Sequence, residues 1–386
     1  MIIYLAWFFL SVVVLYATLK SGREKQMAAV TFFLLALGVF VGLGDMLGGY
    51  DRYIYGELYD AMADNTKLGR SPWLTPSFAF YGSEFGYGTF CALLTYITGN
   101  RYIFIFIATM VIYVLLIQSF RRYVDNAPFA VVMFMGLWFF FTFTYLRQVM
   151  GAAIVWLSVE YIIKRDLKRF ILVLFIAFSF HNSAIVFLPL YFMPFRKFTP
   201  KQVIVLMAVA LVIGLSPIPQ ALFAAYGDVD ADRMTANYEA DAGFRWAYLM
   251  EAGFFLFVIL ANYSKISEED DRELMMLNIA LTFCAILLLF VRSENGGRLG
   301  WFFMIGVFCT MSNICVNQNR VQSYGTLLVV VSFLLFFRIL NAWGVQIAPY
   351  KSFMTDGVRI GDVIHDKYEY DNNYDADKFY RPAFGN

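Results

Sequence analysis

The stretch "KRFILVLFIAFSFHNSAIVFLPLYFMPFRK" (168–197) is apolar for most of its length but begins and ends with basic residues. Short basic loops stay on the cytoplasmic side of a membrane, so the two ends are expected to share one side. Each half holds about 12 residues, or about 18 Å of helix, which is too short to cross. The pattern therefore predicts a broken, re-entrant segment that turns at "FHNSA", around His181. The alternative is one long tilted helix with its ends on opposite sides.

The composition indicates a membrane protein, because 60% of the 386 residues are hydrophobic and only 15% are charged. Apolar runs long enough to cross a bilayer as helices recur along the chain. They lie at about 2–19, 27–47, 101–120, 128–144, 146–163, 202–219, 243–262, 274–291, 300–316 and 322–343. We predict an all-α polytopic transmembrane bundle of about 10–12 membrane segments. The formal net charge of +1 gives no reason to expect nucleic acid as a partner.

The basic loops also set the expected orientation. With "KSGREK" (20–25), "RRY" (121–123) and "KRDLKR" (164–169) in the cytoplasm, residues 48–100 and 220–244 face the other side. Residues 1–343 then form a single transmembrane domain, in which 77–99 is a re-entrant or surface helix. Residues 344–386 are expected to be a polar, extracytoplasmic and partly disordered tail.

Four arginines fall near the extracytoplasmic membrane edge in this topology: Arg147, Arg292, Arg298 and Arg338. Charges at that depth are costly and normally have a partner. A bound anion would supply one, and the planar guanidinium suits phosphate. The alternative is that they pair with Asp51, Glu84, Glu294 or lipid headgroups.

His181 lies at the expected turn, beside Asn182 and Ser183. Imidazole titrates near neutral pH and can serve as a general base. A histidine that only fixes the turn is the alternative. Gly151 follows Arg147 by about one helical turn and would let another helix approach closely.

Glu251 is a second acid within an apolar segment, with Arg245 nearby. It is either a proton-relay group or, more simply, half of a buried ion pair. The four cysteines lie in apolar segments without metal-ligand spacing, so no metal site is expected.

The sequence resembles the EpsG-like family of Wzy-type bacterial polysaccharide polymerases. The similar stretches are "GGYDRYIYGELY" (48–59), "SEFGYGTFCALLTYITGN" (83–100), "LRQVMGAA" (146–153), "FHNSAIVFLPLYF" (180–192), "GRLGWFF" (297–303) and "NAWGVQIAPY" (341–350). They cover most of the chain in the same order.

The resemblance implies a multi-span glycosyltransferase of the lipid-linked-donor (GT-C-like) type in the bacterial cytoplasmic membrane. Such enzymes join repeat units carried on undecaprenyl diphosphate at the extracytoplasmic face, and a chain-length regulator can accompany them. The growing glycan passes from its carrier to a hydroxyl of the next lipid-linked unit. Neither a nucleotide sugar nor a metal or other cofactor is implied.

This chemistry assigns roles to the candidate residues. The leaving diphosphate needs cationic groups, for which Arg147, Arg292, Arg298 and Arg338 are the candidates. The acceptor hydroxyl needs a base, with His181 as first choice and Glu84 as second. The candidate sugar contacts are Asp51, Tyr87, Gln148 and Asn182.

Two other functions fit a polytopic protein with these residues. A flippase for lipid-linked oligosaccharide needs a path open to both faces and often has internal repeats, which we do not find here. A membrane acyltransferase would also use a histidine, but its donor comes from the cytoplasm, away from the outer arginines.

Overall fold

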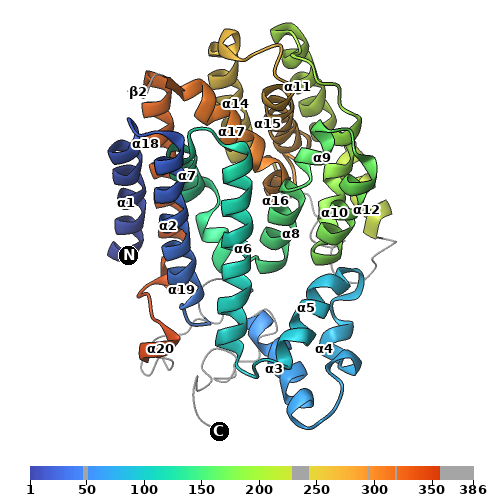
Figure 1. Cartoon of the computed structure of the whole chain (residues 1–386). Coiled ribbons are helices and arrows are strands. Elements are labelled where there is room, and N and C mark those ends of the chain that lie inside the picture. Colours follow the sequence, from blue (N-terminus) through green and yellow to red (C-terminus); the bar gives the residue numbers. More distant parts are fainter. Residues whose placement is uncertain (47–50, 228–242, 294–295, 318–319, 357–386) are drawn as a thin grey trace.

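The computed structural model describes residues 1–46, 51–227, 243–293, 296–317 and 320–356 (Figure 1). Six helical segments are long and apolar enough to cross a membrane: α2 (Arg23–Gly42), α6 (Arg101–Tyr123), Leu146–Ile163, α15 (Asp271–Leu289), Gly296–Cys315 and α18 (Ser323–Ala342). Five further apolar helices are shorter: α1 (Ile2–Thr18), α7 (Ala127–Leu137), η4 (Asn182–Phe192), α11 (Pro200–Leu215) and α14 (Trp246–Ala261). The strands found in the described residues are β1 (Val316–Asn317) and β2 (Arg320–Val321). The prediction of an all-α polytopic membrane bundle is confirmed.

Several long segments are built from shorter helices. Leu146–Ile163 comprises α8 (Leu146–Trp156) and α9 (Val159–Ile163), and Gly296–Cys315 comprises α16 (Gly296–Gly300), η6 (Trp301–Phe303) and α17 (Met304–Cys315). The remaining short helices are η3 (Phe139–Phe143), α12 (Ile218–Gly227) and η5 (Tyr263–Lys265). Local sequence fixes some of the starts. The Asn100 side chain accepts the backbone N–H groups of Tyr102 and Ile103 and thus caps α6.

The segment around His181 is broken and returns on itself. α10 (Leu167–Phe180) ends where His181 adopts an extended backbone with φ −154°, and η4 follows. The far end of η4 lies against the start of α10, because the Tyr191 hydroxyl donates to the Arg165 carbonyl (2.8 Å) and the Tyr191 ring stacks on Phe170. Pro189 lies inside η4 and cannot donate a helical hydrogen bond. The predicted re-entrant segment is therefore confirmed, and the long tilted helix is excluded.

The predicted cytoplasmic loops gather at one end of the bundle, the upper end in Figure 1. Ion pairs join different loops there: Arg23–Asp125 (3.6 Å), Arg272–Asp125 (3.5 Å), Arg122–Glu160 (3.1 Å) and Lys197–Glu268 (3.4 Å). Because α10 starts at this end and runs away from it, His181 lies toward the opposite end.

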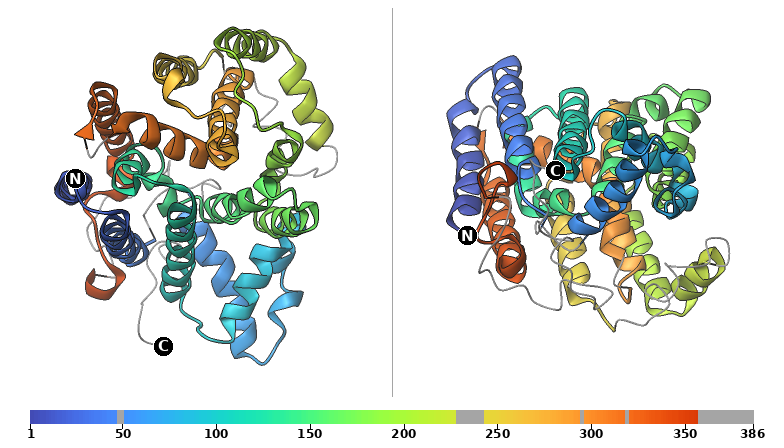
Figure 2. Two further views of the ribbon diagram at one scale, coloured as in Figure 1. Left: turned by 45° about the horizontal axis from the view of Figure 1, so that its top comes forward. Right: turned by 90° about the horizontal axis from the view of Figure 1, so that it is seen from below.

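Residues 51–100 form a group of short helices at the lower end, beside α10 (Figure 2, right). They are α3 (Arg52–Lys67), η1 (Pro72–Leu74), α4 (Pro76–Ala79), η2 (Gly82–Glu84) and α5 (Phe85–Thr95). The predicted re-entrant or surface helix at 77–99 is thus divided among α4, η2 and α5. With 11 residues, α5 is too short to cross a bilayer.

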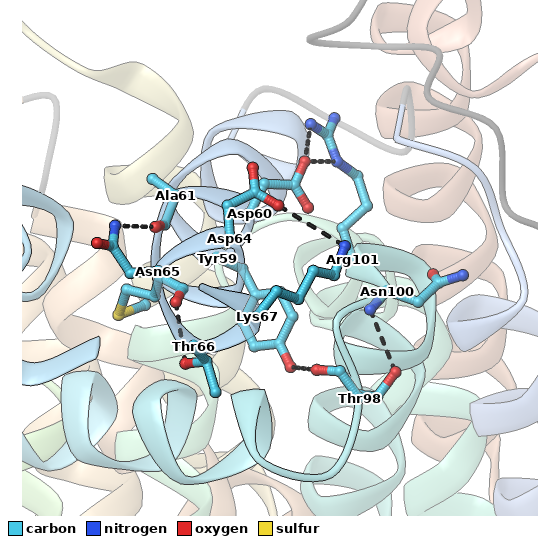
Figure 3. Close-up of polar contacts among 11 residues, drawn as sticks. Tyr59, Asp60, Ala61, Asp64, Asn65, Thr66, Lys67, Thr98, Asn100 and Arg101 are labelled. Atoms are coloured by element: carbon cyan, nitrogen blue, oxygen red, sulfur yellow. Dashed lines mark hydrogen bonds and ion pairs between the residues drawn. The ribbon is translucent and has the colours of Figure 1, made fainter. Parts of the chain in front are cut away.

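A buried ion pair ties this group to the bundle. Figure 3 shows Asp60 of α3 facing Arg101 at the start of α6, and both side chains are less than a tenth exposed. The Tyr59 hydroxyl donates to the Thr98 carbonyl (2.6 Å), and its ring stacks on Phe104 with centroids 4.2 Å apart. The orientation of α3 is therefore fixed by charge and by ring packing.

Arg52 connects this group of short helices to α2. Its guanidinium is fully buried and donates to the carbonyl oxygens of Asp45 (2.7 Å), Gly44 (3.0 Å), Val41 (3.0 Å) and Phe143 (3.2 Å). It satisfies carbonyls that the end of α2 leaves without helical partners. Burial lowers the pKa of Arg52 to about 10, so the group remains charged at neutral pH.

The first part of the expected tail packs on the bundle through α19 (Gly344–Ile347) and α20 (Phe353–Asp356). The Tyr4 hydroxyl donates to the Ile347 carbonyl (2.5 Å), and Tyr350 stacks on Phe40 with centroids 4.2 Å apart. Residues 357–386, with the rest of that tail, and residues 228–242 of the expected outer stretch 220–244 lie outside the described residues.

We expect Asp60→Asn to lower stability far more than Asp64→Asn on the same helix. Removing one partner of a buried ion pair costs about 3–5 kcal/mol, whereas an exposed pair contributes about 0–1 kcal/mol. Asp64 pairs with Lys67 at 3.7 Å, and both side chains are at least half exposed. The measurement is thermal unfolding of the purified proteins in detergent. Equal melting temperatures for the two variants would contradict the structural role of Asp60.

Candidate functional site

A buried carboxylate joins three elements at the lower end of the bundle. Glu84, the last residue of η2, forms an ion pair with Arg147 on α8, through Glu84 Oε2 and Arg147 Nη1. Its other oxygen, Oε1, accepts the backbone N–H of Asn182 (3.2 Å) and lies 3.7 Å from His181 Nδ1. We call Glu84, Arg147 and His181 the central triad. Of the alternatives for Arg147, pairing with Glu84 is the one observed.

Three aromatic rings lie around the Arg147 guanidinium. Its Nε–H donates to the Tyr55 hydroxyl (3.3 Å), and the rings of Tyr55, Phe80 and Tyr81 lie 5.5–6.0 Å from its Cζ. Cations over aromatic faces at this range are stabilised electrostatically. The Arg147 side chain is 24% exposed, against 5% for Glu84, so Arg147 is the more accessible member of the ion pair.

The hydrogen bond at His181 indicates its tautomer. The backbone N–H of Ser183 donates to His181 Nδ1 (3.2 Å), which requires a lone pair on that nitrogen. The neutral ring then carries its proton on Nε2 and can donate a hydrogen bond from there. At 3.7 Å, the separation of Nδ1 from Glu84 Oε1 is too long for a hydrogen bond.

Two glycines let neighbouring helices contact the tip of α10. A Cβ on Gly151 of α8 would lie 3.1 Å from His181 Cβ, and one on Gly86 of α5 would lie 2.1 Å from Ser179 Oγ. The predicted close approach of another helix at Gly151 is confirmed, and α10 is that helix.

The four candidate sugar contacts lie in different settings. Asp51 donates its backbone N–H to Thr144 Oγ1 (2.7 Å), and Gln148 Nε2 donates to the Arg298 carbonyl (2.9 Å). Asn182 reaches Glu84 through its backbone. Tyr87 is fully buried between the rings of Tyr55 and Tyr81, with centroids 5.8 and 5.4 Å away. Tyr87 therefore packs on two of the rings that surround Arg147, and Asn182 contacts Glu84 directly. Gln148 directly follows Arg147 in the chain.

Of the other three candidate arginines, Arg298 is near enough to His181 for its charge to act on the imidazole. Arg298 and Arg338 line a cavity of about 840 Å³, together with Arg245 and Glu251. Arg298 lies over the Tyr145 ring, with Cζ 4.2 Å from the centroid. Arg292 is not among the lining residues, and its Nη1 donates to the Leu215 carbonyl (3.3 Å).

Tyr55 is a partner of Arg147 that the sequence did not indicate. Its spacing from Asp51 places both on one face of a helix, but nothing in the sequence indicates that this face meets α8. Burial raises the pKa of Tyr55, so its hydroxyl stays protonated and can donate to a further acceptor.

Metal ligation finds no support within the described ranges, where no group of three or more His, Cys, Asp or Glu side chains is placed to hold an ion. All four cysteines are buried, as expected for small residues of apolar segments.

Fold and site together define a multi-pass membrane protein with a buried charged centre at one end of its bundle. The EpsG family model matches residues 28–352, and the chain belongs to this family, that of the EpsG-like polysaccharide polymerases. Membership implies a glycosyltransferase-type polymerase in polysaccharide biosynthesis. No curated protein and no solved structure matches the chain.

We expect Gly151→Val to reduce polymer synthesis at least tenfold. The added methyl groups would press on His181 and Ala177, and overpacking of this kind costs about 1–3 kcal/mol. Gly253→Val on α14 is the matched control, because nothing lies within 4 Å of a Cβ there. Polymer from cells that produce each variant would be compared by gel electrophoresis. Normal polymer from Gly151→Val would show that the position of His181 is unimportant.

Proposed function

We propose that the protein joins oligosaccharide repeat units carried on undecaprenyl diphosphate, at the extracytoplasmic face of the bacterial cytoplasmic membrane. The bond from C1 of the reducing-end sugar of the growing glycan to its phosphate oxygen breaks. A bond from that carbon to a hydroxyl oxygen of the incoming unit forms. The hydroxyl proton passes to a base, and the lipid diphosphate leaves.

The observation that carries this proposal is the buried Glu84–Arg147 ion pair at the tip of the re-entrant segment. A polymerase needs a proton acceptor for the hydroxyl and a cation for the leaving diphosphate, placed next to each other. The central triad offers both. The finding that the chain belongs to the EpsG family supports the same reaction class.

The hydrogen bonds favour Glu84 over His181 as the base. Glu84 has oxygen lone pairs beyond those used by Arg147 and by the Asn182 N–H. His181, with its proton on Nε2, is suited to donate a hydrogen bond to a substrate oxygen. Arg147 is the most exposed member of the triad, so we assign it to the leaving diphosphate.

The position of the loops supports the outer face. Basic residues gather at the end of the bundle opposite to the triad, and the positive-inside rule assigns that end to the cytoplasm. Nucleotide-activated sugars are cytosolic, so an outer site requires a donor that a lipid carries across the membrane. A flippase would need a polar path to both ends, and a cytoplasmic acyl donor would meet the opposite end.

We expect Glu84→Gln to lower polymerisation about 100-fold or more, which is the usual contribution of a general base. His181→Gln should retain about ten times the activity of His181→Ala, because an amide can still donate a hydrogen bond. The assay is polymerisation of a purified lipid-linked repeat unit by the detergent-solubilised protein. Glu268→Gln, an exposed glutamate at the opposite end, is the control.

If Glu84→Gln is active while both His181 variants are equally inactive, His181 rather than Glu84 is the base. A wild-type protein that elongates no lipid-linked unit would refute the proposed reaction. Size-exclusion profiles of each variant separate loss of catalysis from loss of folding.

We expect a cysteine at Leu68, directly after α3, to react only with a reagent outside the cell, and one at Lys201 only after the membrane is made permeable. Both positions are exposed, and the four native cysteines are buried and should not react. The measurement is labelling by a membrane-impermeant maleimide. The reverse pattern would contradict the proposed orientation.

A further inference from the structure

A second cavity, of about 660 Å³, lies at the end of the bundle opposite to the central triad, the upper end in Figure 1. It is formed by η5, the β1–β2 hairpin and the first turn of α18, and we call it the hairpin cavity. Among the residues that line it are Lys265, Asn317, Arg320, Gln322, Ser323 and Tyr324. We infer that it binds the phosphate group of an anionic phospholipid, whose acyl chains lie on α14 and α18.

The charged side chains that line the hairpin cavity are two cations, Lys265 and Arg320. Lys265 Nζ donates to three uncharged acceptors: Asn262 Oδ1 (2.7 Å), the Ile314 carbonyl (3.5 Å) and Gln322 Oε1. The Arg320 side chain is exposed and makes no hydrogen bond or ion pair with another described residue. Within the described part of the chain, two positive charges thus meet at one cavity that no carboxylate lines.

The acidic loop that follows Lys265 is engaged elsewhere. Glu268 pairs with Lys197 (3.4 Å), the Asp270 side chain caps α15, and Glu273 accepts a backbone N–H of the same loop (3.2 Å). None of the five carboxylates of residues 268–273 lines the hairpin cavity. The two cations are therefore left for an anion from outside the chain.

The polar groups around the two cations are suited to phosphate oxygens. Asn317 and Ser323 line the cavity, and their side chains make no hydrogen bond with another described residue. The planar guanidinium of Arg320 can bind two phosphate oxygens at once. The α18 N-cap residue, Gln322, gives its side-chain oxygen to Lys265 and does not cap the helix, so first-turn N–H groups add to the attraction.

Apolar side chains beside the cavity indicate that the phosphate belongs to a lipid. Tyr324 lines the cavity, and its ring contacts Phe257 of α14 edge to face, with centroids 6.0 Å apart. Phe257 (55%) and Leu327 (42%), one turn further along α18, are exposed. A free phosphate would gain nothing from these side chains, whereas acyl chains can pack on them. Basic pockets between membrane helices bind anionic lipid headgroups in this way.

A lipid in this cavity would join three helices. Asn262 is the C-cap of α14, Ile314 lies in the last turn of α17 and Gln322 is the N-cap of α18, and Lys265 already contacts all three. A phosphate between Lys265 and Arg320 adds a further link between η5 and the hairpin. Because a ligand that binds only the folded state stabilises it, the lipid should raise the melting temperature.

The test is thermal unfolding of the full-length protein in a non-ionic detergent, with each probe titrated into the micelles. The probes are dioleoyl phosphatidylglycerol, dioleoyl phosphatidylcholine and sodium phosphate. We expect phosphatidylglycerol to raise the melting temperature with a midpoint concentration at least about tenfold lower than that of phosphatidylcholine, because only the former carries a net negative charge. Sodium phosphate should leave the melting temperature unchanged.

Arg320→Gln should raise the phosphatidylglycerol midpoint about tenfold, since it removes a charge-assisted hydrogen bond. Its melting temperature without lipid should equal that of the wild type, because the Arg320 side chain has no partner to lose among the described residues. Arg121→Gln is the matched control: it alters an exposed arginine at the same end that does not line the cavity, and should respond like the wild type.

Asn317→Asp separates loss of binding from loss of folding. Asn317 lies opposite Arg320 in the hairpin, and opposite charges at facing positions of two strands attract each other. The new carboxylate would occupy the Arg320 guanidinium in place of the lipid. We expect the response to phosphatidylglycerol to disappear while the melting temperature without lipid stays the same or rises, which misfolding cannot produce.

Three results would overturn the inference. Equal midpoints for the two lipids would show that the cavity does not select a negative charge, and an equal effect of sodium phosphate would make it a site for free phosphate. Unchanged midpoints in both Arg320→Gln and Asn317→Asp would place the lipid elsewhere. None of these results depends on the reaction proposed for the triad, and failure of the wild type to polymerise would refute that reaction alone.

Discussion

The Glu84–Arg147 ion pair is the interaction on which the lower end of the bundle depends. A buried charge is costly unless it is paired and hydrogen-bonded, and here the pair is satisfied by groups from four parts of the chain. α8 supplies Arg147, η2 supplies Glu84, α3 supplies the Tyr55 hydroxyl and the turn after α10 supplies the Asn182 N–H. The re-entrant segment, the short helices of residues 51–100 and a membrane-length segment thus meet at one carboxylate.

The rest of the architecture keeps these parts in place. Arg52 and the Asp60–Arg101 ion pair attach α3 to the ends of α2 and α6, so the element that carries Tyr55 cannot shift freely. Gly86 and Gly151 remove side chains on both sides of the tip of α10. The site therefore lies at the ends of rigid helices. There, backbone and charged groups can be reached from outside the apolar core.

A second polar centre is the cavity lined by Arg245, Glu251, Arg298 and Arg338. The central triad has a formal charge near zero and is mostly buried, which suits proton transfer and bond breaking. This cavity combines its four charged side chains with apolar walls. Gln148 lies between them, because its Nε2 donates to the Arg298 carbonyl.

Much of the fold follows from the one-dimensional pattern of the chain. The length of the apolar runs predicted the bundle, because a bilayer sets the length that a helix needs. The basic residues at both ends of 168–197 predicted the return of the chain at His181, because the positive-inside rule places both ends on the same side of the membrane. The spacing of Arg147 and Gly151 predicted the close helix contact.

Contacts between distant segments could not be read from that pattern. The sequence offered Glu84 as one of several partners for Arg147, and only the packing of η2 against α8 selected it. It grouped Arg147, Arg292, Arg298 and Arg338 by depth alone. In the structure, Arg147 belongs to the triad, Arg298 and Arg338 line a cavity with Glu251, and Arg292 contacts Leu215. Sequence determined which residues reach the lower end of the bundle, since hydrophobic length and loop charge are local properties. Which of them meet was decided by tertiary structure, since charges find their partners across the bundle rather than along the chain.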